Sequence, residues 1–247
     1  MVDKKWIFFD FDGTLLPMDQ DVFANTYFQA LGDYLVPYGY DKTSLIQAVW
    51  AGTKAMVMND GRKTNMEVFW DTFSGILGSD VRKDMPVFER FYAEEFVKAR
   101  KVCGIHPEAG KLIEDLHHKG YRLVLATNPI FPRTATMQRI AWAGINADLF
   151  EEITTYEDYS YSKPSLKYYE ELAEKLGIDP AGCIMIGNDA VEDLAAIRLG
   201  MQVYLVTDDL INTRNVDLQD YPHGAFSELR SWLKLDEEIS DEDLQQI

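Results

Sequence analysis

The sequence predicts an α/β fold: a Rossmann-like parallel sheet with helices on both faces, plus an inserted α-helical segment. Strand-like apolar runs alternate with helical patterns, and a glycine follows each of these helices. Continuous apolar runs are typical of parallel strands that are covered on both faces. Between about residues 17 and 100 the alternation stops, and apolar residues recur at helical spacing instead.

The predicted elements of the sheet layer follow from short apolar runs and from helix start and stop signals. Four strands are expected, over residues 6–9, 121–126, 183–186 and 202–206, with a further short strand over 150–155. Helices are expected over 107–119, 132–143, 164–176 and 191–199. Three of these helices open with proline, which suits the first turn, and all four end at glycine.

We expect the inserted segment to be a bundle of about four helices, interrupted at 37–39, 59–61 and 78–80. Its many aromatic residues are predicted to form the core of the bundle. The predicted domains are a Rossmann-like core from residues 1–16 and 101–235, and a helical domain from 17–100. An acidic tail, 236–247, follows the core.

Composition excludes several classes of partner. A net charge of −17 over 247 residues argues against binding to nucleic acid or to anionic lipid, which both attract Lys and Arg clusters. The two cysteines, Cys103 and Cys183, are expected to be free thiols. No apolar stretch has transmembrane length and the first residues lack a signal-peptide pattern, so we expect a cytoplasmic location.

The first strand runs directly into two aspartates, in the string Asp10-Phe11-Asp12-Gly13-Thr14. Residues two apart in a strand project from the same side, so Asp10 and Asp12 are expected to face one site. Two carboxylates at the end of a buried strand are unfavourable unless a cation or a substrate uses them. An isolated Asp-Gly pair marks a turn, but the full string is much rarer and therefore indicates catalysis.

Polar residues also follow two other predicted strands. In an open α/β sheet, ligands bind beyond the carboxyl ends of the strands. Thr127 and Asn128 occupy that position after the second strand, although either could simply cap a turn. Asp189 follows the strand 183–186, where its carboxylate suits a hard cation such as Mg²⁺.

Two further residues become candidates through their position. Lys163 precedes a helix at the same edge of the sheet, where it could neutralise phosphate and hold a carboxylate, although most lysines are simply solvated. Asp193 could orient metal ligands or Lys163. The alternative for acids at a helix start is a favourable interaction with the helix dipole.

Taken in order, these four segments resemble the motifs of the haloacid dehalogenase superfamily of aspartate-nucleophile hydrolases. The string 10–14 matches the first motif in full, and Thr127 matches the Ser/Thr of the second. Lys163 matches the third, and Gly187-Asn188-Asp189 with Asp193 matches the acidic fourth. The phosphatases and phosphotransferases of this superfamily carry Asp at the position of Asp12, so the resemblance implies phosphoryl transfer and not halide displacement.

The resemblance implies a role for each matched residue. Asp10 would be the nucleophile that forms an aspartyl-phosphate, and Asp12 the general acid and base. Mg²⁺ would be bound by Asp10, the main-chain carbonyl of Asp12 and Asp189. Thr127 and Lys163 would hold phosphoryl oxygens. The remaining assignments are substrate binding for Asn128 and a supporting position behind the ligands for Asn188 and Asp193.

The inserted bundle resembles the cap that this superfamily places between its first and second motifs. Its hinges are predicted near 17–20 and 102–104. The polar break at 59–65 holds Arg62 and Lys63, which we expect to face the substrate, although an exposed turn is an equal alternative.

The function predicted from these features is Mg²⁺-dependent hydrolysis of a small phosphorylated metabolite by a monomer or homodimer. The alternatives are a phosphomutase or phosphotransferase of the same superfamily, or a non-catalytic relative that keeps the fold and binds a partner.

Overall fold

The structure is a computed structural model that describes residues 6–235; the predicted acidic tail lies outside this range. It contains a six-stranded parallel sheet with the strand order β3-β2-β1-β4-β5-β6, which confirms the predicted α/β class. The strands are β1 Trp6–Phe9, β2 Arg122–Leu125, β3 Phe150–Ile153, β4 Cys183–Gly187, β5 Gln202–Val206 and β6 His223–Gly224. The sequence did not predict β6, because a two-residue strand of His and Gly carries no apolar pattern.

The register of the sheet explains why the strand sequences are continuously apolar. Phe8 of β1 lies beside Val124 of β2 and Met185 of β4, and these three residues belong to one hydrophobic cluster. Their neighbours Ile7 and Phe9 belong to a second cluster on the opposite face. Both faces of the central strands are therefore buried, as the apolar runs predict.

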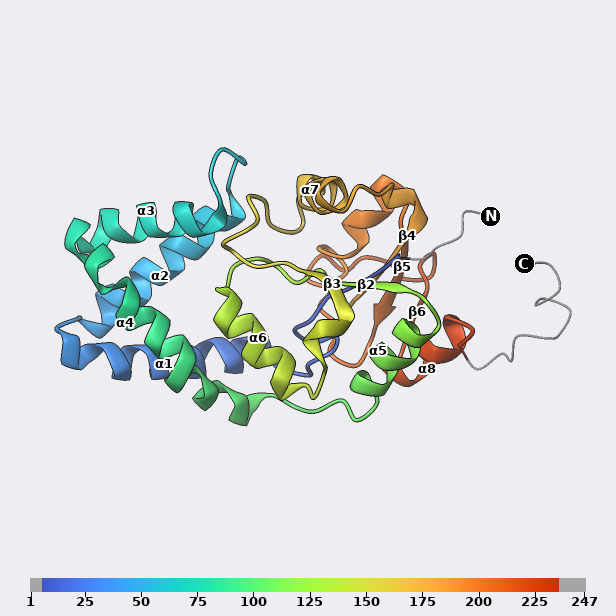
Figure 1. Cartoon of the computed structure of the whole chain (residues 1–247), viewed down its shortest axis with the longest axis horizontal. Helices are drawn as coiled ribbons and strands as arrows, with labels where there is room; N and C mark the ends of the chain where they lie inside the picture. The colour runs from blue at the N-terminus through green and yellow to red at the C-terminus, as the bar shows by residue number, and fades with distance from the viewer. Residues whose placement is uncertain (1–5, 236–247) are drawn as a thin grey trace, which may run out of the picture.

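Helices cover both faces (Figure 1). The face that carries Ile7 packs against α5 Ala109–His118, α6 Arg133–Trp142 and α8 Phe226–Trp232. The face that carries Phe8 packs against α7 Leu166–Leu176 and the 3₁₀ helix Leu194–Leu199. The helices predicted over 107–119, 132–143 and 164–176 are thus present with slightly shorter bounds.

The prediction of a helix over 191–199 is wrong in its first half. Residues 190–193 form a turn, and only Leu194–Leu199 is helical, as a 3₁₀ helix. The reason is local, because the Asp189 carboxylate accepts hydrogen bonds from the main-chain N–H groups of Val191 and Glu192. Aspartate commonly stabilises turns in this way.

The regular elements of the inserted segment are all helices, joined by short turns and loops. It contains α1 Gln20–Leu35, α2 Lys42–Val57, α3 Asn65–Leu77 and α4 Met85–Arg90, followed by π- and 3₁₀-helical turns over Phe91–Val102. The side chains of Asp19, Asp41 and Thr64 cap the first three helices, and each accepts a main-chain N–H. None of the helices in residues 6–235 is both long and apolar enough to cross a membrane.

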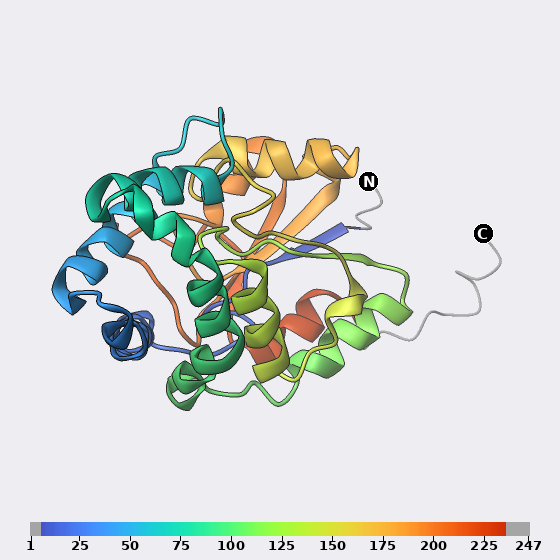
Figure 2. The same cartoon turned by 60° about the vertical axis from the view of Figure 1, so that its left-hand side comes forward.

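The chain enters and leaves this helical segment at adjacent points. Met18 and Cys103 form an antiparallel bridge, and the N–H of Gly104 donates to the carbonyl of Pro17 at 2.7 Å. The segment lies at one end of the molecule, beyond the carboxyl ends of the strands (Figure 2). The buried Asn65 also ties it to the sheet layer, because its Nδ2 donates to the carbonyl of Pro129 at 3.0 Å.

The packing of α2 against α3 can be tested with Gly52→Ala. A Cβ at Gly52 would lie 2.6 Å from the ring of Phe69. We expect this variant to lose about 1–3 kcal/mol of unfolding free energy in urea denaturation, because the ring must move. Gly75→Ala is the matched control: a Cβ there meets nothing within 4 Å, so about 0.5–1 kcal/mol should be gained. Stabilisation by both substitutions would contradict the described packing.

Candidate active site

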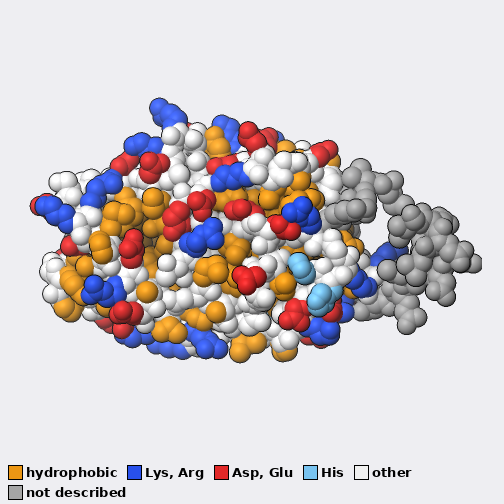
Figure 3. Space-filling model, viewed as in Figure 1, with side chains coloured by type: hydrophobic (Ala, Val, Ile, Leu, Met, Phe, Trp, Pro, Cys, Tyr) orange, Lys and Arg blue, Asp and Glu red, His pale blue; other side chains and the backbone are white. Residues whose placement is uncertain are grey.

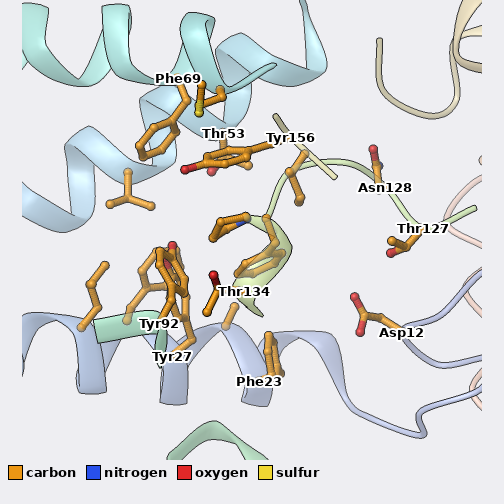
Figure 4. Close-up of a pocket in the computed structure, with 18 of the residues that line it drawn as sticks. Asp12, Phe23, Tyr27, Thr53, Phe69, Tyr92, Thr127, Asn128, Thr134 and Tyr156 are labelled. Carbon is orange, nitrogen blue, oxygen red and sulfur yellow. The ribbon is translucent and has the colours of Figure 1, made fainter. Parts of the chain in front are cut away.

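Polar residues from three strand ends line one cavity of about 780 Å³ between the sheet and the helical segment (Figure 4). The predicted site residues among its lining are Asp10, Asp12, Thr127, Asn128, Asn188 and Asp189. They come together because β1, β2 and β4 are neighbours in the sheet and all end at the same edge. In Figure 4 the side chains of Asp12 and Thr127 lie at one end of this cavity.

Lys163 lies beneath this edge, fully buried between two carboxylates. Its Nζ donates to Oδ1 of Asp10 and to Oδ1 of Asp193, each at 2.8 Å. Burial opposes the charge on this ammonium, but the two carboxylates outweigh it and hold the pKa of Lys163 well above its usual range. Lys163 does not itself line the cavity; its direct link to a lining residue is the contact with Asp10.

Thr14 and Asn188 fix the other side of the Asp10 carboxylate. The Thr14 hydroxyl lies 3.2 Å from Oδ2 of Asp10 and 3.0 Å from Oδ1 of Asn188. The amide of Asn188 donates in turn to the carbonyl of Asp209 at 2.6 Å. Gly13 allows this close approach: its φ is +85°, and a Cβ there would lie 2.2 Å from Nδ2 of Asn188. Asp10 is therefore held by neighbours on both of its oxygens.

Asp12 has a different environment from Asp10. Its Oδ2 forms an ion pair with the fully buried guanidinium of Arg139, and its Oδ1 is buried without a hydrogen-bond partner among the described residues. Burial raises the pKa of Asp12, while the charge of Arg139 opposes that shift. The raised pKa favours a carboxyl group that can hold a proton.

The loop after β2 places Thr127 and Asn128. The carbonyl of Thr127 accepts hydrogen bonds from the hydroxyls of Thr154 at 2.6 Å and Tyr168 at 3.0 Å. Nδ2 of Asn128 lies 3.2 Å from both carboxylate oxygens of Glu192. Burial raises the pKa of Glu192 to about 8, although the charge of Lys163 opposes this shift. Both predicted residues thus border the cavity beside Asp12.

The predicted metal ligands offer oxygen donors only, which fits Mg²⁺. Oδ1 of Asp189 accepts two main-chain N–H groups, and its second oxygen takes part in neither bond. No three His, Cys, Asp or Glu side chains within residues 6–235 lie close enough together to hold a metal by themselves. The carboxylates of Asp10, Asp12 and Asp189 thus do not form a three-acid cluster. The predicted set instead uses two carboxylates and the main-chain carbonyl of Asp12.

Arg62 and Lys63 are not brought to the site. Arg62 is paired with Asp60, and Lys63 donates to Asp71 at 2.6 Å. Neither cation lines the cavity, and both side chains are exposed. The acidic partners lie nearby in the same helical segment, and they direct both cations to the surface. The position of these residues therefore does not support the predicted role in substrate binding.

Sequence reasoning missed Arg139 and Thr14 as parts of the site. Arg139 lies in α6, where an arginine within a helical pattern gives no sign of burial. It also lies over the ring of Phe131, 4.6 Å from the centroid. Thr14 belongs to the first motif, but its contact with Asn188 joins residues 174 positions apart and no local pattern predicts it.

Comparison with known proteins places the chain in a family. A sequence profile for haloacid dehalogenase-like hydrolases matches residues 4–200. Glyceraldehyde 3-phosphate phosphatase of Methanothermobacter thermautotrophicus is 31% identical over 105 residues, which is 42% of this chain and 45% of that protein. Phosphoglycolate phosphatase of Aliivibrio fischeri is 25% identical over 209 residues, which is 83% of this chain and 85% of that protein.

Solved structures show the same fold in proteins with different names. A 2-haloacid dehalogenase from Pseudomonas syringae superposes with a TM-score of 0.60 at 19% identity, covering 93% of this chain and 98% of that one. A HAD phosphatase from Thermococcus onnurineus gives a TM-score of 0.56 at 20% identity, with 93% and 97% covered. The fold alone therefore does not separate dehalogenase from phosphatase chemistry. Together with the motif geometry, the match over residues 4–200 shows that this chain belongs to the haloacid dehalogenase-like hydrolases.

Proposed function

We propose that this chain is a phosphatase that hydrolyses a phosphomonoester through an aspartyl-phosphate on Asp10. The proposal rests on one observation: Asp10 and Asp12, at the end of β1, both line the same cavity. The phosphatase names of relatives that match over most of the chain support this assignment over halide displacement.

The first step is attack by a carboxylate oxygen of Asp10 on phosphorus. A bond forms between that oxygen and phosphorus, and the bond from phosphorus to the ester oxygen breaks. Contacts with Lys163 and Thr14 hold the Asp10 carboxylate against the end of the cavity, so little reorientation is needed. Water then attacks phosphorus, releasing phosphate and restoring Asp10.

Asp12 acts as general acid in the first step and as general base in the second. It donates a proton to the departing alkoxide and then removes one from the attacking water. Its raised pKa supports the first role, and its unpartnered Oδ1 leaves an oxygen for this exchange. Arg139 would stabilise the carboxylate that remains after donation, because its guanidinium already contacts Oδ2.

The remaining lining residues would position the phosphoryl group. Thr127 and Asn128 are placed to donate to oxygens that do not react, from a loop fixed by Thr154 and Tyr168. Mg²⁺ held by Asp10, the carbonyl of Asp12 and Asp189 would neutralise charge on the phosphoryl oxygens. The helical segment, residues 17–100, would act as the cap that shields this chemistry from water.

Asp10→Asn tests the nucleophile. We expect kcat for Mg²⁺-dependent hydrolysis of p-nitrophenyl phosphate to fall by about 10³-fold or more, because an amide cannot form the phosphoryl ester. The wild-type rate should also vanish with EDTA and return with excess Mg²⁺. Asp41→Asn, which changes an exposed helix cap in α2, is the matched control and should keep its rate. Substantial turnover by Asp10→Asn would remove Asp10 from this role.

Lys163→Met tests the buried charge cluster. Without the ammonium, two neighbouring carboxylates are buried with no counter-charge, so we expect about 3–5 kcal/mol less unfolding free energy at pH 7. Burial already raises the pKa of Asp193 and Lys163 opposes that shift, so the variant should raise it further. A carboxyl group whose pKa is raised in the folded state loses stability for the fold as pH rises towards that pKa. The loss of unfolding free energy in Lys163→Met, relative to the wild type, should therefore be smaller at pH 5 than at pH 7.

The matched control is Lys167→Met, an exposed lysine in α7 whose ammonium lies over the ring of Tyr161. It should change stability by less than about 0.5 kcal/mol. The measurement is the unfolding free energy of both variants in urea, at pH 5 and at pH 7. Equal losses for the two lysines, or a deficit at position 163 that grows as pH falls, would contradict the described cluster.

A further inference from the structure

The cavity has two chemically different ends. The end at the sheet edge carries Asp10, Asp12 and the hydrogen-bonding groups described above. The rest of the lining comes largely from the helical segment and is mostly apolar, with aromatic rings prominent (Figure 4). These rings include Phe23, Tyr27, Trp50, Phe69, Tyr92 and Tyr156. An ester whose phosphorus meets Asp10 must therefore extend its alcohol towards these rings.

The aromatic end is held in place by its own contacts. The hydroxyls of Tyr27 and Tyr92 are hydrogen-bonded to each other at 2.8 Å, so each polar tip has a partner and the two rings hold each other in place. Phe69 stacks on Phe73 with a centroid distance of 5.3 Å. Hydrophobic side chains reach the surface over these helices, at the left of Figure 3, and over other parts of the same face. A preformed wall of rings favours a flat or branched apolar ligand.

The charges that line the cavity disfavour a second anionic group on the substrate. Seven acidic residues line it, and its only cationic lining residue within the described chain is Arg90. Three of these acids lie outside the predicted motifs: Asp21 belongs to α1, Glu89 to α4 and Glu157 to the loop after β3. A carboxylate on the alcohol would face these acids with little compensation. The wall of rings would also leave its oxygens poorly solvated.

We propose that the substrate is a phosphomonoester of a bulky aromatic or apolar alcohol that carries no additional negative charge. This inference rests on the proposed phosphatase function and names its substrate class. It separates this chain from relatives whose names specify phosphoglycolate and glyceraldehyde 3-phosphate, which are small and polar. Specificity arises from burial of the leaving alcohol against the rings, while the phosphoryl group is held at the sheet edge.

The test compares three alkyl phosphates with the full chain in Mg²⁺: 2-phenylethyl phosphate, ethyl phosphate and 2-phosphoglycolate. The first two have similar alkyl leaving groups, so a difference in kcat/KM reports contacts with the phenyl ring. We expect kcat/KM for 2-phenylethyl phosphate to be about 100-fold larger than for ethyl phosphate, because several apolar carbons of the phenyl ring become buried. The kcat/KM for ethyl phosphate should exceed that for phosphoglycolate, in which a carboxylate replaces the methyl group of ethyl phosphate.

Trp50→Ala supplies the matched variant. Trp50 lines the cavity and is 53% exposed, with its ring centroid 5.0 Å from that of Phe28, so its loss should leave the fold intact. The ratio of kcat/KM for phenylethyl over ethyl phosphate should fall by about tenfold. Tyr38→Ala removes a similarly exposed aromatic residue outside the cavity, whose ring centroid lies 5.7 Å from that of Tyr34, and it should leave this ratio unchanged.

The outcomes separate the two proposals. Hydrolysis with phosphoglycolate as the best of the three substrates overturns the substrate class and leaves the phosphatase assignment standing. The same conclusion follows if the phenylethyl preference is absent or if Tyr38→Ala lowers the ratio as much as Trp50→Ala. No Mg²⁺-dependent release of phosphate from any of the three by folded protein overturns both proposals.

Discussion

The arrangement of the site depends on one buried ammonium. Lys163 is fully buried and bridges Asp10 and Asp193, and no other cation within residues 6–235 lies within hydrogen-bond distance of either carboxylate. Two unpaired carboxylates in this interior would be strongly destabilising, so the lysine makes it possible to keep Asp10 charged beneath the cavity. Asp193 extends the arrangement, because its Oδ2 accepts the N–H of Asp189 at 3.0 Å. The proposed nucleophile and the proposed metal ligand are thereby held in one connected unit.

The neighbouring Asp12 shows how two carboxylates two residues apart can differ. Asp10 contacts an ammonium and a hydroxyl, whereas Asp12 contacts a guanidinium with one oxygen, and its other oxygen has no hydrogen-bond partner within residues 6–235. Distinct surroundings are what divides nucleophile and general acid between residues of the same type. Beyond this pair, aromatic rings that come largely from the helical segment line the same cavity as the two aspartates.

The sheet and the strand-end residues were predictable because parallel strands are apolar runs whose carboxyl ends meet at one edge. Contacts between segments far apart in the sequence were not predictable. Arg139 gave no signal, since burial of a helical arginine depends on the tertiary contact with Asp12. Arg62 and Lys63 were selected because they are cations in an acidic chain, but nearby acids bind them at the surface. The aromatic residues expected to form the bundle core also line the cavity, which spacing alone does not reveal. The domain boundaries, oligomeric state and cytoplasmic location stay predictions.

The central claim is that Asp10 becomes phosphorylated during turnover. Acid quenching of the enzyme during steady-state turnover, followed by borohydride reduction and peptide mass spectrometry, converts an acyl phosphate on aspartate to homoserine at the modified position. The account predicts homoserine at residue 10, and its absence when substrate or Mg²⁺ is omitted. Rapid phosphate release with no modified peptide, or with the modification at Asp12, would contradict it.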